Sequence, residues 1–214
     1  MKAPTITIER LWHVGDLEAG SKRRNSYEGT GLSVSLHPGA WRTIGRGIVG
    51  GGTWALDRQG ACFLHAVHLN VRQKKEILAW GMQQGYVAEA DLWKWSYWDD
   101  DLDQEVYQTF LSRAEAVEEA ECDEDDECVT KVAGHISTAS LDTATMQDGP
   151  SHGTASVLDL LLPLYVEKAT DLDGVWWDER LDPLCLSAPR GVIPADRLTK
   201  WTISSCEFDP DDED

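Results

Sequence analysis

The chain lacks any long apolar run. None of its 214 residues lies in a stretch approaching the roughly 18 consecutive apolar residues that a membrane-spanning helix needs, so we expect no contact with a membrane. The N-terminal segment 1–6 also lacks the apolar core of a signal peptide. Five cysteines, an odd number without a CxxC pair, favour a reducing compartment over a disulfide framework. Together these absences predict a cytoplasmic protein.

The common phosphate-binding motifs are missing as well. The sequence contains no GxxxxGK[ST] and no GxGxxG after a predicted strand. The glycine cluster at 45–52 lacks the lysine of a phosphate loop and follows no predicted strand, so we interpret it as a flexible connector. His65 and His68 form an HxxH pair, but no third ligand is evident, and we therefore predict no metal site.

Basic residues are scarce, with 19 lysines and arginines against 38 acidic residues and a net charge of −19. The acidic excess is confined to 99–127, with fourteen acidic residues and one basic residue, and to 207–214, with six acidic residues. The remainder of the chain is balanced. We expect a solvated acidic loop at 121–128 and a disordered acidic tail at 207–214. Direct binding of nucleic acid is disfavoured, because it normally requires a basic surface.

Ten tryptophans and an apolar share of 42% are enough for the core of a single domain over 1–206. Alternating or short apolar runs predict strands near both ends of the chain. These predicted strands cover 5–8, 10–14, 31–36, 62–67, 135–140, 157–167, 174–178, 184–188 and 198–203. The part between them, about 73–121, is predicted as a helical insertion with one buried stripe. Strands at both ends with helices between them indicate an α+β fold rather than a doubly wound sheet.

Two segments near the ends of the chain place polar side chains among large apolar ones. In the first, Leu-Trp-His-Val-Gly at 11–15 is followed by Gly-Leu-Ser-Val-Ser at 31–35. The second is Gly-Val-Trp-Trp-Asp-Glu at 174–179. A polar side chain on a core strand must find a partner, or it lowers stability. An imidazole, paired hydroxyls and a carboxylate could therefore meet in one cleft if these strands are neighbours.

This arrangement resembles the ADP-ribosyltransferase superfamily, which includes the RNA 2′-phosphotransferases. In that superfamily an early strand carries a His or Arg that holds the nicotinamide nucleotide. The resemblance gives this role to His13, with Arg10 as the alternative. Ser33 and Ser35 look like the Ser-x-Ser that follows, and Tyr27 is similar to an aromatic residue that stacks on the nucleotide.

A late strand of the superfamily carries a glutamate, which Glu179 resembles. Asp178 is the alternative, and the more usual Glu-x-Glu pair is absent. The segment 187–194 resembles the closing strand. The resemblance covers about 5–60 and 155–203, and it implies a split antiparallel β-sheet core with an inserted acidic helical segment.

The chemistry of the superfamily suits these residue types. Cleavage of the nicotinamide–ribose bond of NAD passes through an oxocarbenium-like state, which a nearby carboxylate stabilises. The resemblance therefore implies an NAD-dependent ADP-ribosyltransferase that modifies a protein or nucleic-acid acceptor, with Glu179 and His13 as catalytic residues. Each candidate also has a structural explanation. His13 would then be a satisfied core histidine, the two serines exposed strand residues, and Glu179 one half of a surface ion pair.

The acidic segments support a second hypothesis. Residues 99–127 would bind a basic protein partner, and the chain would act as an inhibitor that imitates DNA, without catalysis. Such an inhibitor suits a phage or plasmid counter-defence role, and the transferase suits a toxin as well. A third hypothesis retains the transferase-like fold as a scaffold without turnover.

Overall fold

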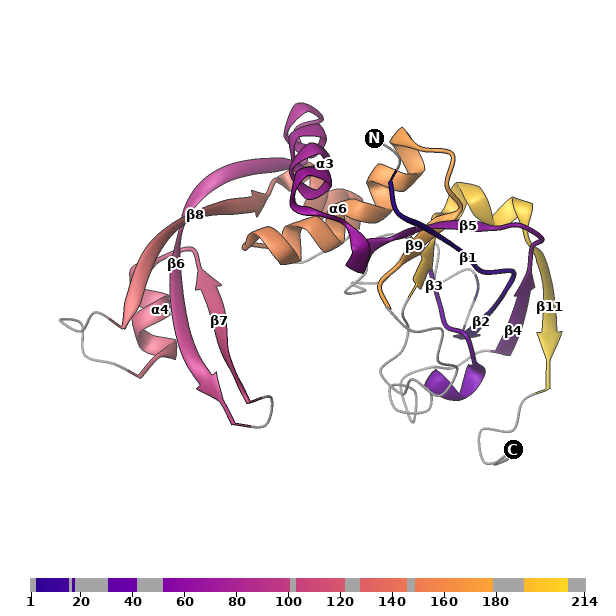
Figure 1. The fold of residues 1–214 in the computed structure, drawn as a ribbon, viewed down its shortest axis with the longest axis horizontal. Helices are drawn as coiled ribbons and strands as arrows, with labels where there is room; N and C mark the ends of the chain where they lie inside the picture. Colours follow the sequence, from indigo (N-terminus) through magenta and orange to yellow (C-terminus); the bar gives the residue numbers. More distant parts are fainter. Residues whose placement is uncertain are drawn as a thin grey trace.

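The computed structural model describes residues 3–15, 17, 31–41, 52–100, 103–121, 128–145, 149–178 and 191–207. The protein is mixed α+β, with several antiparallel sheets and few helices in this part of the chain. Figure 1 shows one sheet at the left end of the molecule, two further sheets at the right end, and helices between them.

A five-stranded sheet forms the middle layer of the right-hand part. In spatial order its strands are β1 (Thr5–Thr7), β5 (Cys62–His65), β9 (Gly174–Trp176), β10 (Gly191–Ile193) and β3 (Leu32–Val34). Neighbouring strands are antiparallel except for β5 and β9, which run parallel. Strands from both ends of the sequence therefore lie side by side. This is the condition under which polar groups of the two end segments could meet in one cleft.

A three-stranded antiparallel sheet packs on one face of this layer. Its order is β11 (Thr202–Cys206), β4 (Gly52–Asp57) and β2 (Arg10–Gly15), and η3 (Ala195–Lys200) precedes β11. A bridge between Trp12 and Ser35 links β2 to the chain just after β3 through two backbone hydrogen bonds of 2.8 and 2.9 Å. The two sheets are thus joined at the point where the first end segment folds back on itself.

Side-chain alternation builds a core on both faces of the five-stranded sheet. On β9, Val175 packs against the helices, and the next residue, Trp176, packs against the three-stranded sheet beside Leu11. On β10, Val192 and Ile193 divide in the same way. A strand buried on both faces is apolar at consecutive positions, which explains the short unbroken apolar runs in these strands.

Helices α3 (Val71–Gln83), α5 (Ala139–Thr145) and α6 (Thr154–Ala169) pack on the other face, and we call the two sheets and these helices the core region. α3 begins with a capping box. The Asn70 side chain accepts a hydrogen bond from the Gln73 backbone, and the Gln73 side chain accepts one from the Asn70 backbone. Within the described ranges, no helix has both the length and the apolar character needed to cross a membrane.

The predicted strand at 157–167 is wrong, because α6 occupies these residues. The segment is rich in leucine, which is a strong helix former. Its apolar side chains are buried on nearly every side, in contact with α3, β8 and β9. A helix buried all round has no polar face, so its sequence shows no helical period and reads like a buried strand.

A second, smaller unit lies at the left end of Figure 1. Strands β6 (Val87–Asp99), β7 (Gln104–Phe110) and β8 (Val129–Ser137) form an antiparallel sheet with β6 in the centre. α4 (Arg113–Glu119) covers one face, where Ala116 and Val117 pack with Val129. We call these four elements the hairpin region.

The predicted helical insertion over 73–121 is therefore wrong in its middle part, where β6 and β7 lie, and is confirmed only at its ends, in α3 and α4. Trp93, Trp95 and Tyr97 recur with period two along β6, and the ring of Trp95 stacks on that of Tyr97 with centroids 4.6 Å apart. Aromatic residues favour strands because their side chains can pack against neighbours on the same face of a sheet. Val106 and Phe110 are four residues apart, a spacing that fits one face of a strand as well as one face of a helix.

The remaining sequence predictions have mixed outcomes. The strands predicted at 5–8, 10–14, 31–36, 62–67 and 174–178 are confirmed with small shifts of their ends. The prediction at 135–140 covers only the end of β8, and the one at 198–203 covers η3 and the start of β11. The predicted strand at 184–188, nearly all of the acidic loop and all but the first residue of the acidic tail lie outside the described residues.

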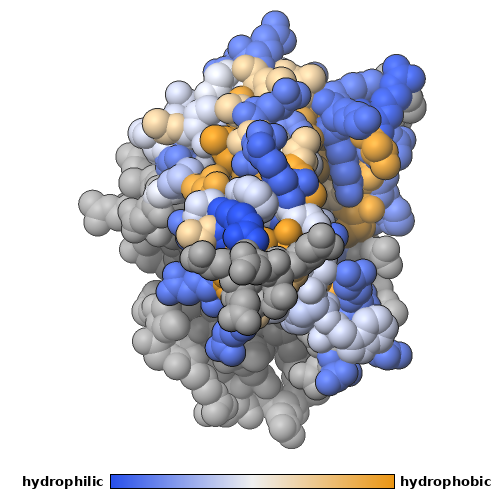
Figure 2. Space-filling view, turned by 90° about the vertical axis from the view of Figure 1, so that its left-hand side faces the viewer, coloured by the Kyte–Doolittle hydropathy of each residue, from blue (hydrophilic) through white to orange (hydrophobic). Residues whose placement is uncertain are grey.

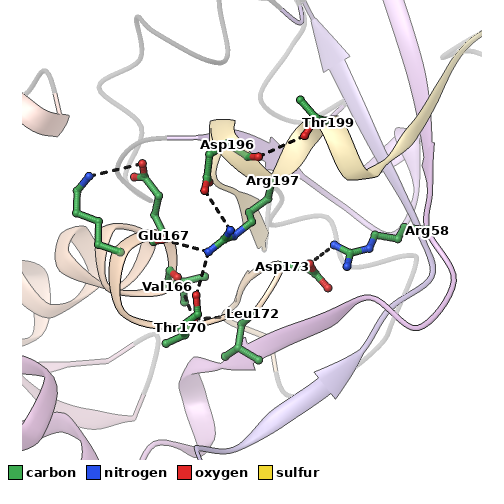
Figure 3. A network of polar contacts seen from close by, with 10 residues as sticks. Arg58, Val166, Glu167, Thr170, Leu172, Asp173, Asp196, Arg197 and Thr199 are labelled. Carbon is green, nitrogen blue, oxygen red and sulfur yellow. Dashed lines mark hydrogen bonds and ion pairs between the residues drawn. The ribbon is translucent and has the colours of Figure 1, made fainter.

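Two arginines secure the connection that leads into β9 (Figure 3). Arg58, directly after β4, forms an ion pair with buried Asp173, directly before β9. Arg197 of η3 donates hydrogen bonds to the carbonyls of Glu167 and Thr170, at the end of α6. The last carbonyls of a helix have no intrahelical partner. Arg197 therefore caps α6, and Arg58 fixes the chain as it enters the sheet.

Candidate functional site

His13 lies on β2 and is buried, with 1% of its surface exposed. Its ring Nδ1 lies 2.8 Å from the carbonyl oxygen of Ser33 on β3. Because a carbonyl oxygen only accepts, Nδ1 carries the proton and donates this bond. In the neutral ring Nε2 is then the acceptor nitrogen. The hydrogen bond fixes both the tautomer and the orientation of the imidazole.

Ser33 and Ser35 are buried, with 5% and 2% of their surfaces exposed, so the alternative interpretation as exposed strand residues is wrong. Ser33 is paired with Val192, whose side chain faces the helices, and the Ser33 hydroxyl lies on that same side. The Ser35 hydroxyl donates to the carbonyl of His37 at 2.8 Å. The structure therefore brings His13 to the backbone of Ser33 and directs the Ser33 hydroxyl to the other side of the sheet.

Arg10 does not share a site with His13. The two residues lie on opposite faces of β2, because side chains alternate along a strand. The Arg10 guanidinium is exposed and donates two hydrogen bonds to Asp57 on β4, at 2.7 and 3.0 Å. These bonds hold the pKa of the Asp57 carboxyl below its usual value. Arg10 therefore joins two strands at the surface.

The second end segment enters the same core. Trp176 on β9 belongs to the cluster that contains Leu11 of β2 and Leu32 and Val34 of β3. Only β10 separates β9 from β3 in the sheet. Asp178 is the second residue after β9, whereas Glu179 and Tyr27, the other two candidates, lie outside the described residues.

Two contacts that the sequence analysis missed hold the residues after β9. The Trp177 indole nitrogen donates to Asp159 of α6 at 3.0 Å, and the His65 Nε2 nitrogen donates to the Asp178 carbonyl at 2.7 Å. Burial raises the pKa of Asp159, although the bond from Trp177 and the charge of Lys74 act in the opposite direction. The sequence signal for these contacts was a histidine on an apolar strand and an aspartate inside an apolar helix.

The two histidines of the HxxH pair pack against each other. The rings of His65 and His68 meet edge to face with centroids 4.3 Å apart. Among the residues that the structure describes, no group of three His, Cys, Asp or Glu side chains is placed to hold a metal ion.

The described cysteines differ in whether they form a disulfide. Cys62 and Cys206 are free thiols, but Cys128, which directly precedes β8, is disulfide-bonded. The sequence had favoured a reducing compartment over a disulfide framework, and the bond at Cys128 is a departure from that expectation.

Comparisons of the chain with protein-family models, with curated proteins and with solved structures give no match. The function must therefore be inferred from the residues and contacts of the site itself.

Proposed function

We propose that the chain is an ADP-ribosyltransferase-like enzyme that uses NAD to modify a macromolecular acceptor. The observation that carries the proposal is the 2.8 Å hydrogen bond from the His13 ring on β2 to the Ser33 carbonyl on β3. It joins the two halves of the first end segment. The second end segment begins on β9, two strands from β3 in the same sheet, and continues to Asp178.

His13 is the residue proposed to orient NAD. Its Nδ1–H donates to the Ser33 carbonyl, which holds the ring in one tautomer and one orientation between β2 and β3. A ring held in one tautomer and one orientation loses little freedom when a ligand binds, which favours precise positioning of the reacting bond. The ring of Tyr27 is proposed to complete the contacts with the nucleotide, whereas the Ser33 hydroxyl faces the helices and the Ser35 hydroxyl donates to the His37 carbonyl.

Glu179 is the proposed carboxylate that stabilises the positive charge on the ribose. As the nicotinamide–ribose bond breaks, nicotinamide leaves with the bonding electrons. The nucleophile of the acceptor then forms the new bond to the ribose carbon and loses its proton. The hydrogen bonds from Trp177 to Asp159 and from His65 to the Asp178 carbonyl support a fixed direction for the chain that leads to Glu179.

Release of nicotinamide from labelled NAD tests the proposal directly. We expect the intact chain to release nicotinamide slowly in water and faster once an acceptor is present. Glu179→Gln should abolish most of the release, because the charge is lost and the shape is kept. If the intact chain neither binds NAD nor releases nicotinamide, the enzyme proposal is wrong and the scaffold hypothesis is favoured.

Asp178→Asn is the matched control for Glu179→Gln. The contact described for Asp178 is made by its backbone carbonyl, which this change retains. If Glu179 is the catalytic carboxylate, Asp178→Asn should keep most of the activity. The opposite result would give the role to Asp178.

A second candidate function, the acidic inhibitor, is favoured by the ordered surface of α4. Glu115, Glu118 and Glu119 are exposed on this short helix, on the side away from Ala116 and Val117. Figure 2 looks onto this end of the molecule, where hydrophilic residues predominate and hydrophobic ones interrupt them. Binding to a basic protein that survives Glu179→Gln but not the combined change of these three glutamates to glutamine would support the inhibitor.

A further inference from the structure

A groove lies on the face of the hairpin region that α4 leaves uncovered. It has a volume of about 730 Å³ and is bordered by β6, β7, β8 and the beginning of α6. Lys94 and Tyr107 lie on its floor, and His152 and Ser156 lie on its wall. The volume falls within the range of roughly 300–1,000 Å³ that is usual for small-molecule sites.

The charge of the groove is opposite to that of the chain. None of the described residues that line it is an aspartate or glutamate, although the chain contains 38 of them. Lys94 lies in the groove and forms no ion pair with any described carboxylate. A smaller groove of about 440 Å³, on the other face of the same sheet, is lined by both Glu89 and Asp91. The larger groove is therefore complementary to an anion, and the smaller one is not.

The wall of the groove adds hydrogen-bond donors to this charge. His152 lies within 3.5 Å of the Thr109 hydroxyl across the groove, and Ser156 contributes a second hydroxyl. α6 begins here at Gly153, which has no side chain to cap the helix. The first N–H groups of a helix have no intrahelical acceptor. A phosphate in the groove would meet these donors together with the Lys94 ammonium.

The floor of the groove offers a flat aromatic surface. Tyr107 is 62% exposed, and the Lys94 ammonium lies 4.8 Å from the centre of its ring. Trp98, which is also largely exposed, lies diagonally across β6 and β7 from Tyr107 on the same face. Exposed aromatic rings beside a cation are suited to stacking of a nucleobase.

We propose that this groove binds a nucleoside monophosphate, with the phosphate at Lys94 and the start of α6 and the base on Tyr107. The site lies on the hairpin region and is separate from the site proposed around His13. It therefore goes beyond the proposed transferase, and the two proposals can fail independently.

Calorimetric titration of the full chain with AMP tests this inference. Lys94→Met should weaken AMP binding about tenfold, because a charge-assisted hydrogen bond is lost. Lys131→Met is the matched control and should leave the affinity unchanged, since Lys131 pairs with Asp91 on the other face of the same sheet. Tyr107→Ala should also weaken binding about tenfold through loss of stacking. Circular dichroism checks that each variant is folded.

Three results would overturn the inference. The first is no detectable binding of AMP to the intact chain. The second is an equal loss in Lys94→Met and Lys131→Met, which would indicate a general effect of charge. The third is equal affinity for AMP and for inorganic phosphate, which would exclude a contribution from the base. None of these measurements depends on nicotinamide release.

Discussion

The core region and the hairpin region use their polar residues in opposite ways. In the core region His13, Ser35 and Asp173 are buried, and each makes a hydrogen bond to protein atoms. In the hairpin region Lys94 and Tyr107 lie in a groove that is open to solvent. Polar groups of the first kind are held in place by protein atoms, and polar groups of the second kind are exposed to solvent, where a ligand can reach them.

The two regions also differ in the size of their cores. Two large apolar clusters lie on the two faces of the five-stranded sheet, whereas the buried cluster of the hairpin region consists of Ala116, Val117 and Val129. Burial of apolar surface is the main favourable term in folding. The core region should therefore supply most of the stability, and changes on the surface of the hairpin region should affect binding without unfolding the protein.

The largest effect on stability is expected for Asp173→Ala. The change leaves Arg58 without its partner and removes the acceptor for the backbone N–H of Cys62. Breaking a buried ion pair by removing one partner lowers stability by roughly 4 kcal/mol. Urea denaturation followed by fluorescence measures the loss.

Asp57→Ala is the control for an exposed ion pair. Asp57 pairs with Arg10 at the surface, where the two charges remain solvated. We expect only a small change in the free energy of unfolding. Equal losses for Asp173→Ala and Asp57→Ala would contradict the difference in burial on which the comparison rests.

A matched pair of leucines gives the next largest effect. Leu11 is fully buried between the two sheets of the core region, whereas Leu111, between β7 and α4, is 41% exposed. Leu11→Ala should lower the free energy of unfolding by about 3 kcal/mol, because it removes buried methyl groups and leaves a cavity. Leu111→Ala should cost less than about 1 kcal/mol. If Leu111→Ala lowered the free energy of unfolding more than Leu11→Ala, the hairpin region would be the less tolerant of the two regions to loss of apolar side chains.

The fold could be predicted where a strand alternates or lies between turn residues. The strands near His13, Ser33 and Trp176 are confirmed for this reason. The residues 87–110 and 157–167 were assigned to the wrong class, because spacings of four fit both strand and helix and an unbroken apolar run has no period. Tertiary packing decides such segments, and α4 and α3 are the elements that pack on them.

The site could be predicted only in part. The sequence indicated that His13 and Ser33 would be neighbours, and the ring of His13 does contact the Ser33 backbone. The contact between Asp159 and Trp177 could not be predicted, because it depends on how α6 lies against β9. Arg10 was assigned to the same site as His13, although the period of a strand places them on opposite faces.

A smaller effect is expected for Ser35→Ala in the core region. The change removes the hydrogen bond from the buried Ser35 side chain to the His37 carbonyl. The free energy of unfolding should fall by about 1 kcal/mol. Ser205→Ala on β11 is the control, because Ser205 is exposed and should change stability very little. A loss as large in Ser205→Ala would count against a specific role for the buried hydroxyl.

The smallest effect is expected for Asp159→Asn, and its size should depend on pH. Burial raises the pKa of Asp159 in the folded chain, so the folded state binds a proton more tightly than the unfolded state. The extra proton affinity of the folded state stabilises the native protein fully below the ordinary aspartate pKa. This contribution to the free energy of unfolding is lost as the pH rises through the raised pKa. Asparagine does not titrate, and its carbonyl still accepts the hydrogen bond from Trp177. Asp159→Asn should therefore gain in stability relative to the native chain as the pH rises.

Asp57→Asn should show the opposite sign in the same series of urea denaturations. The hydrogen bond from Arg10 lowers the pKa of Asp57, so its ionised form stabilises the folded state above the ordinary aspartate pKa. That contribution disappears as the pH falls through the lowered value, and the native chain and Asp57→Asn should then converge. Two aspartates on different elements of the core region thus respond to pH in opposite directions, because one is buried beside an indole and the other is held by a guanidinium at the surface. If both variants changed with pH in the same direction, burial could not be the cause of the behaviour of Asp159.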